Sequence, residues 1–147
     1  MLVDGSCHCG DITYRAEIDP GKVIICHCTD CQALSSSAFR MVVLAERGSF
    51  RLMSGNPTVY IKTADSGRQR AHAFCPRCGT QMYATPPGAN PEQHYGLRVG
   101  SIRQRAQLRP MRQLWCRSAF DWVNEIAKIP QSDSASLTPP PAAPLSP

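Results

Sequence analysis

The sequence predicts a small, mainly β domain in which short antiparallel strands form the sheets and one or two short helices accompany them. Three observations lead to this prediction. Short apolar or alternating segments recur along the chain, glycine and proline residues separate them, and seven of the eight cysteines lie in three tight groups. Many short strands between turns are typical of a sandwich, a barrel or a pair of small sheets. Grouped cysteines are typical of metal ligands that stabilise a small fold.

Eight segments carry the strand pattern. In the first, Ile12, Tyr14 and Ala16 alternate with polar residues, which indicates a strand that is buried on one face. The others are short and rich in β-branched or aromatic residues, which favour strands. They span 22–26, 39–44, 49–53, 58–62, 70–75, 80–84 and 95–99.

Two helices are expected. Thr29 and Gln32 are three residues apart, as in a capping box, and this predicts a short helix over 29–35. Cys31 would then lie in the first turn, where the positive end of a helix lowers the pKa of a thiol. A second helix is expected over 119–128, where apolar residues recur every three positions.

The length of 147 residues corresponds to one domain. We expect residues 1–130 to form it and residues 131–147 to be a disordered or extended tail. That tail is rich in Pro, Ser and Ala and has almost no large apolar side chain. No apolar run reaches the roughly 18–20 residues of a membrane span, and no signal-peptide pattern opens the chain. These features predict a cytoplasmic protein without a membrane partner.

The net charge of +5 comes mostly from arginine, with 13 arginines against three lysines. Because arginine binds carboxylates and phosphates through two parallel hydrogen bonds, this bias indicates an anionic ligand. The segment 103–117 holds five arginines and no acid. Only Trp115 in it offers a surface for base stacking, so we interpret it as a solvated face and expect no nucleic-acid partner.

Cys75 and Cys78 flank two residues and precede Gly79, the pattern of a turn that presents two sulfurs to one metal ion. Cys7 and Cys9 are one residue apart, so an extended chain places both sulfurs on one face and His8 on the other. Together these four cysteines would complete a closed, tetrahedral, structural zinc site.

Cys26, Cys28 and Cys31 remain, and three ligands with an open position are typical of catalytic zinc. By the same alternation, His27 is expected to point away from the metal. A rival grouping would combine Cys28 and Cys31 with the Cys75 and Cys78 turn into a rubredoxin-like site. A further alternative treats the Cys-x-x-Cys pairs as redox dithiols, although they lack a βαβ context.

The order of these motifs, Cys-His-Cys-Gly, Cys-His-Cys-x-x-Cys and Phe-Cys-x-x-Cys-Gly, resembles the glutathione-dependent formaldehyde-activating enzyme family, which includes centromere protein V. Further pieces agree with it, namely Ser-Ala-Phe at 37–39, Ser-Gly-Asn-Pro at 54–57, Gly-Ser at 100–101 and Leu-Arg-Pro at 108–110. The resemblance covers about residues 3–122. The chain departs from the family pattern at Ser36, Gln113 and Cys116, where the family often has Gly, His and an aliphatic or aromatic residue.

The resemblance implies a β-tent fold related to zinc ribbons and two zinc ions per chain. It implies a carbon–sulfur lyase activity in which a thiol such as glutathione adds reversibly to a small aldehyde such as formaldehyde. It assigns the structural zinc to Cys7, Cys9, Cys75 and Cys78 and the catalytic zinc to Cys26, Cys28 and Cys31.

Two other functions stay open at this point. The second zinc could serve only to stabilise a binding module for protein or nucleic acid, or Cys116 could serve a redox enzyme, although we expect it to be a buried core residue. Lone His72 and His94 are given no role. Candidate ligands for substrate carboxylates are Arg68, Arg70, Arg98 and Arg103.

Overall fold

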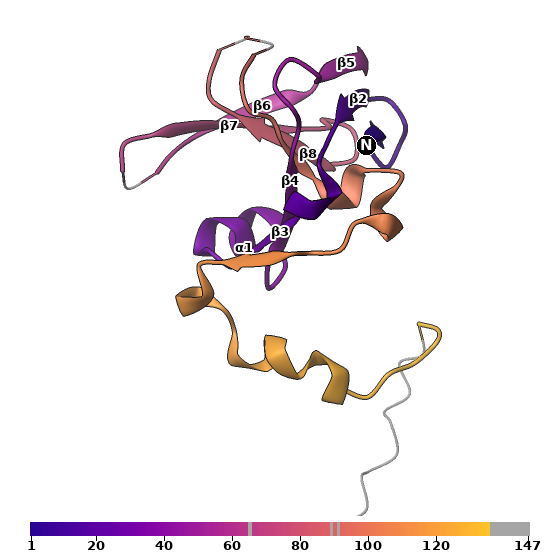
Figure 1. Cartoon of the computed structure of the whole chain (residues 1–147), viewed down its shortest axis with the longest axis vertical. Helices are drawn as coiled ribbons and strands as arrows, with labels where there is room; N and C mark the ends of the chain where they lie inside the picture. The colour runs from indigo at the N-terminus through magenta and orange to yellow at the C-terminus, as the bar shows by residue number, and fades with distance from the viewer. Residues whose placement is uncertain (65, 89, 91, 136–147) are drawn as a thin grey trace, which may run out of the picture.

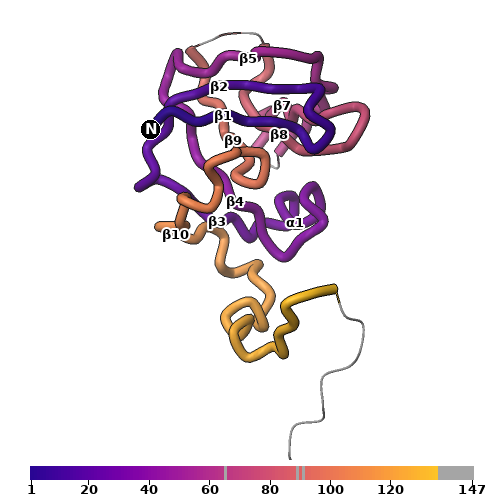
Figure 2. The backbone as a smooth tube through the Cα atoms, turned by 90° about the vertical axis from the view of Figure 1, so that its right-hand side faces the viewer, coloured from indigo at the N-terminus to yellow at the C-terminus, as the bar shows by residue number. Residues whose placement is uncertain are grey.

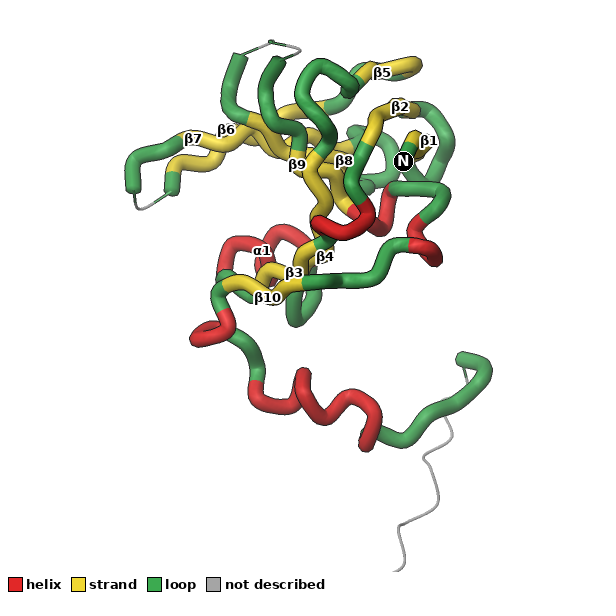
Figure 3. The backbone as a smooth tube through the Cα atoms, viewed as in Figure 1, coloured by secondary structure: helices red, strands yellow, loops and turns green. Residues whose placement is uncertain are grey.

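The computed structural model describes residues 1–64, 66–88, 90 and 92–135. Within this part of the chain the fold is mainly β, with two sheets and no barrel (Figures 1 and 3). The predicted mainly β class is therefore confirmed. Of the three expected architectures, the structure has the pair of sheets. The smaller sheet has the order β1-β2-β5 and consists of β1 (Leu2–Ser6), β2 (Thr13–Glu17) and β5 (Arg51–Ser54).

The larger sheet has seven strands in the order β10-β3-β4-β9-β8-β7-β6. Its neighbours are antiparallel except β10 and β3, which pair in parallel and so depart from the predicted antiparallel sheets. After β9 the chain passes through two 3-10 helices, and the following strand β10 then runs beside β3 in the same direction. The strands are β3 (Ile24–Cys26), β4 (Arg40–Leu44), β6 (Thr58–Thr63), β7 (Gln69–Phe74), β8 (Gln81–Thr85), β9 (Gly96–Arg98) and β10 (Arg112–Leu114).

The core combines residues of both sheets, which lie one over the other in Figure 2. Tyr14 and Ala16 are buried on β2 while Thr13, Arg15 and Glu17 are not, so the predicted alternation is confirmed. The ring of Tyr14 leaves no room for a side chain at residue 5, where an added Cβ would lie 2.0 Å from it. Gly5 is therefore required for the two strands to pack.

One α-helix, α1 (Thr29–Ser35), occurs in the described part of the chain, and short 3-10 helices accompany the strands. Its first cap is not Thr29, as the capping-box pattern predicted, but Cys28, whose Sγ accepts a hydrogen bond from the N–H of Cys31. The helix ends at Ser35, and its C-cap Ser36 adopts a left-handed conformation with φ 48°. The 3-10 helices are η1 (Pro20–Lys22), η2 (Val99–Ser101), η3 (Arg105–Gln107), η4 (Cys116–Ser118) and η5 (Asp121–Lys128).

The C-terminal part extends away from the two sheets in both views (Figures 1 and 2). The expected helix over 119–128 is present as the 3-10 helix η5, but two of the apolar residues that recur every three positions, Phe120 and Ile126, are exposed. Cys116 is also exposed, so its predicted core role is wrong. It belongs to η4, a turn that leaves the sheet edge after β10. Residues 131–135 are exposed, and the rest of the expected tail lies outside the described residues.

The sequence did not predict β1 or β10. The first contains Asp4 and Gly5, which disfavour strands, and the second is a short edge strand with polar Arg112 and Gln113. The arginine-rich segment 103–117 forms η3, β10 and η4, and its five arginines are exposed, as expected of a solvated face. No helix of the described residues is long and apolar enough to cross a membrane.

Candidate metal centres and adjoining cavities

Four cysteine sulfurs meet where the β1–β2 turn approaches the turn between β7 and β8. The Sγ atoms of Cys7, Cys9, Cys75 and Cys78 all lie within 4.8 Å of one another. Cys7 and Cys9 are 3.5 Å apart and Cys9 and Cys75 are 3.7 Å apart, measured between sulfurs. A tetrahedron with zinc–sulfur bonds of about 2.3 Å has edges of about 3.8 Å, so this donor set fits zinc.

The backbone around these sulfurs explains how they are held. Gly79 has φ 70° and donates from its N–H to the carbonyl of Cys75, which closes the turn as predicted. The N–H of Ile12 donates to Cys7 Sγ at 3.2 Å. Hydrogen bonds from Thr80 lower the pKa of the Cys78 thiol to about 5, which favours the thiolate that a metal ion needs. His8 is exposed and outside the cluster.

The second cluster joins the end of β3 to the start of α1. The Sγ atoms of Cys26, Cys28 and Cys31 lie within 4.8 Å of one another, with 3.5 Å between those of Cys26 and Cys28. These sulfurs also fit zinc, with three ligands instead of four. Since Cys75 and Cys78 lie with Cys7 and Cys9, the rubredoxin-like grouping is not formed.

The thiols of the second cluster are unequal. A hydrogen bond from the Cys31 thiol lowers the pKa of Cys26 to about 5. The same hydrogen bond raises the pKa of Cys31, so the lowering that we expected from the start of α1 does not occur. The interaction with the neighbouring sulfur outweighs the effect of a helix of only two turns.

His27 lies between two of these cysteines and is fully buried. Its Nε2 is 2.7 Å from Oε1 of Gln113 on β10, and its ring contacts Phe39 edge-on. His27 is not part of the three-cysteine cluster, as the alternation along the strand predicted. Gln113, one of the departures from the family pattern, therefore fixes the orientation of His27.

Two cavities reach the three-cysteine cluster. One of about 610 Å³ is lined by Cys28, and one of about 460 Å³ is lined by Cys26 and Cys31. Arg70 and Trp115 line both. Neither of these cavities, nor a third of about 420 Å³ in the described part of the chain, is lined by a sulfur of the four-cysteine cluster.

The cavity beside Cys28 is basic. Lys62, Arg68, Arg70 and Arg117 line it, and Asp30, its one acidic lining residue among those described, forms an ion pair with Lys62. Of the arginines proposed from sequence for substrate carboxylates, Arg68 and Arg70 thus lie at this cavity.

Arg98, another arginine proposed from sequence, lies deeper in the fold and lines the cavities of about 420 and 460 Å³. Arg103 is exposed and lines none of the three cavities that we describe.

The cavity beside Cys26 and Cys31 contains two residues whose importance the sequence did not indicate. Arg40 is 4% exposed, and His72 is 8% exposed. The sequence did contain one indication for Arg40, because it is the one charged residue inside the apolar run 39–44. For His72, the only signal was its position two residues after Arg70 on the same strand face.

Arg98 Nη2 donates to Nδ1 of His72 at 3.1 Å. Burial and the charge of Arg98 lower the pKa of His72 to about 4, so the ring is neutral near pH 7. Because Nδ1 accepts a hydrogen bond, Nε2 carries the proton. No partner among the described residues accepts a hydrogen bond from this Nε2–H, which leaves it available to a ligand in the cavity.

The fold and these clusters define a small mainly β protein with two candidate metal centres, of which one is closed and one faces cavities. The sequence model of the glutathione-dependent formaldehyde-activating enzyme matches residues 2–118. The chain therefore belongs to this family, and the resemblance noted in the sequence is confirmed.

Similar proteins include a fission-yeast lyase and a bacterial protein of known structure. An uncharacterized lyase of Schizosaccharomyces pombe is 34% identical over 89 residues, which is 60% of this chain and 61% of that protein. The match thus spans about three fifths of the relative's length. The crystal structure of a Rhodobacter sphaeroides protein has a TM-score of 0.58 and 23% identity, covering 76% of this chain and 99% of that one. This second likeness supports the fold.

Proposed function

We propose that the protein is a zinc-dependent enzyme of the carbon–sulfur lyase type, which reversibly adds a thiol such as glutathione to a small aldehyde such as formaldehyde. Its membership of the formaldehyde-activating family and the lyase name of its yeast relative support this class. The observation that carries the proposal is the three-cysteine cluster, whose sulfurs line two cavities.

The reaction requires no oxidant or reductant. The sulfur of the thiol bonds to the carbonyl carbon, the carbonyl π bond breaks, and the thiol proton ends on the former carbonyl oxygen. The reverse reaction breaks the same carbon–sulfur bond. An enzyme for this addition needs an activated thiol, a polarised carbonyl and a site that holds both together.

Seven cysteines would hold two zinc ions. A zinc ion bound by three thiolates is a soft Lewis acid with an open position, and it lowers the pKa of a thiol that binds there. The residues that would bind the ions are Cys7, Cys9, Cys75 and Cys78 for the structural ion and Cys26, Cys28 and Cys31 for the catalytic one.

The other residues of the cavities have separate roles in this proposal. His72 offers its Nε2–H to the carbonyl oxygen, on which negative charge develops, and it stays neutral because of its lowered pKa. Arg68 and Arg70 give the entrance beside Cys28 a positive potential that attracts an anionic thiol. Trp115 contributes an apolar wall to both cavities.

The test compares Cys28→Ser with Cys116→Ser. Thiols add to formaldehyde without a catalyst, so the enzymatic rate is measured by exchange NMR as a saturable excess over the background. Cys28→Ser should retain about one of two zinc ions and lose the excess rate by at least about a hundredfold, since loss of a ligand costs more than loss of its outer partners. Cys116→Ser should keep both ions and the rate, because Cys116 is exposed and outside both clusters.

Other outcomes would favour the alternatives. Loss of rate in Cys116→Ser with both zinc ions retained would instead favour a redox enzyme that uses this thiol. A fully zinc-loaded protein without any excess rate, for several thiols and aldehydes, would contradict the proposal and favour a non-catalytic binding module.

A further inference from the structure

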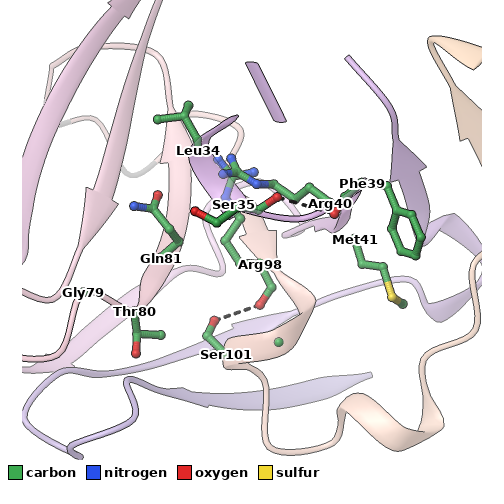
Figure 4. Close-up of a pocket in the computed structure, with 12 residues that line it drawn as sticks. Leu34, Ser35, Phe39, Arg40, Met41, Gly79, Thr80, Gln81, Arg98 and Ser101 are labelled. Atoms are coloured by element: carbon green, nitrogen blue, oxygen red, sulfur yellow. Dashed lines mark hydrogen bonds between the residues drawn. The ribbon is translucent and has the colours of Figure 1, made fainter. Parts of the chain in front are cut away.

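The cavity of about 420 Å³ lies between the end of α1, the start of β8, and strands β4 and β9 (Figure 4). Arg40, Gln81 and Arg98 line it together with hydroxyl and apolar side chains. In Figure 4 the side chains of Arg40 and Arg98 enter from different strands and run toward one another. Both arginines also line the cavity that contains Cys26 and Cys31, so the two cavities meet at their side chains.

Polar atoms without partners are concentrated here. Buried atoms that lack a hydrogen bond, among the described residues, are Nη1 and Nη2 of Arg40, Nε of Arg98, Oε1 of Gln81 and Nδ1 of His27. All but the last belong to residues that line this one cavity. Buried polar groups in folded proteins are nearly always hydrogen-bonded, because leaving one without a partner is costly. A group of such atoms at one cavity indicates the place of a bound ligand.

The charges indicate what kind of ligand it is. Arg40 and Arg98 are 4% and 8% exposed, and neither takes part in any of the ion pairs formed by the described residues. The neutral ring of His72, which accepts from Arg98, brings no negative charge. The acidic groups that act on both arginines are thiols of the second cluster. With a zinc ion bound, three thiolates and the divalent ion would together carry a single negative charge, which would leave one of the two buried positive charges uncompensated.

We propose that this cavity is a carboxylate-binding site. Arg40 and Arg98 donate to the carboxylate of a small ligand, and Gln81 Oε1 accepts a hydrogen bond from an O–H or N–H beside that carboxylate. The structure thus assigns to the site a small carboxylic acid with a neighbouring hydrogen-bond donor. Formaldehyde has neither group, so the substrate that reaches the three-cysteine cluster from this side is a thiol or aldehyde that itself carries a carboxylate. This last step rests on the proposed function, while the binding site does not.

The first experiment uses the full, zinc-loaded chain and three unreactive probes of similar size. Glycolate has both a carboxylate and a hydroxyl group, acetate lacks the hydroxyl group, and glycolamide lacks the charge. Binding is followed by the melting temperature and by the ¹H–¹⁵N resonance of the Arg98 Nε–H, which has no partner in the free protein. Glycolate should shift both signals saturably, acetate should bind about tenfold more weakly, and glycolamide should not bind.

Substitutions then assign the contacts. Arg98→Gln should weaken glycolate binding by at least about tenfold, since hydrogen bonds to charged groups are the stronger ones. Arg103→Gln is the matched control, because Arg103 is exposed and lines none of the three cavities, and it should leave binding unchanged. Gln81→Leu should bind glycolate about as weakly as acetate, which would remove the preference for the hydroxyl group.

Zinc content is measured for every variant, because the buried arginines could serve only to compensate the thiolates. If none of the probes binds at concentrations of about tens of millimolar, the carboxylate site is refuted, and loss of zinc in Arg98→Gln would then identify charge compensation as its role. Equal binding of glycolate and glycolamide would refute it as well. These readouts need no catalysis, so the binding site and the proposed function can fail independently.

Discussion

The two cysteine clusters contain the same kind of ligand but differ in what surrounds them. The four-cysteine cluster joins two turns, and none of its sulfurs lines any of the three cavities in the described part of the chain. The three-cysteine cluster lies at a strand end and a helix start, beside cavities that contain buried arginines and His72. The comparison teaches that the number of sulfurs and the space around them, rather than the residue type, separate the proposed structural site from the proposed catalytic one.

The largest expected effect comes from breaking the closed cluster. Cys75 is fully buried. Its sulfur lies with those of Cys7 and Cys9, so a metal ion held there would link the turn before β8 to the β1–β2 turn. We expect Cys75→Ser to destabilise the fold by about 5 kcal/mol or more, since structural zinc contributes its binding free energy to folding. Circular dichroism melts and zinc analysis measure the effect. The melting temperature of Cys28→Ser should lie within a few degrees of that of the unmodified protein. An equal loss of stability in both variants would contradict the view that the four-cysteine cluster is the one that stabilises the fold.

A smaller effect is expected beside the open cluster. Gln113→Leu removes the acceptor of His27 Nε2 and leaves a fully buried ring with no partner on either nitrogen. We expect a loss of about 1–2 kcal/mol in the free energy of unfolding, the usual cost of an unsatisfied buried donor. A chelator should also remove zinc faster from the three-cysteine cluster and at an unchanged rate from the other. Gln113→Glu keeps an acceptor and is the control; if it behaves like Gln113→Leu, the hydrogen bond is not responsible.

The smallest effects concern two residues with positive φ, Gly79 directly after the Cys75–Cys78 turn and Ser36 at the end of the helix that contains Cys31. Gly79 and Ser36 both have positive φ, 70° and 48°, but only glycine adopts this conformation without strain. An added Cβ at Gly79 meets nothing within 4 Å, so Gly79→Ala tests the backbone alone. We expect Gly79→Ala to cost about 1 kcal/mol and Ser36→Gly to gain a similar amount in urea unfolding. Changes of the same sign in both variants would contradict this account.

The sequence was most informative where chemistry is local. Cys26, Cys28 and Cys31 lie within six positions, and Gly79 closes the Cys75–Cys78 turn, so spacing favoured the two groups of sulfurs that the structure brings together, although it left a rubredoxin-like grouping open. Alternation along β2 predicted which of its residues are buried. These features depend on neighbouring residues, whose geometry varies little between folds.

The features that the sequence missed depend on distant contacts. Arg40 and Gln81 come from different strands, and nothing near either residue shows that both line one cavity. Strand β10 is polar and forms only because it can pair with the edge of β3. Cys116 was expected in the core because free cysteines are usually buried, but its turn leaves the sheet after that edge strand.

The separation of the ligands along the chain also bears on how the protein folds. Cys9 and Cys75 are 66 positions apart, and closing a loop of that length is entropically more costly than bringing together ligands a few residues apart. Contacts of such high sequence separation form late and slow the folding of β proteins. The three-cysteine segment can thus gather its ligands on a chain that is still largely open, whereas the four-cysteine cluster closes only when both of its turns have formed. We therefore expect the three-cysteine cluster to assemble early and the four-cysteine cluster to limit the rate at which the fold is completed.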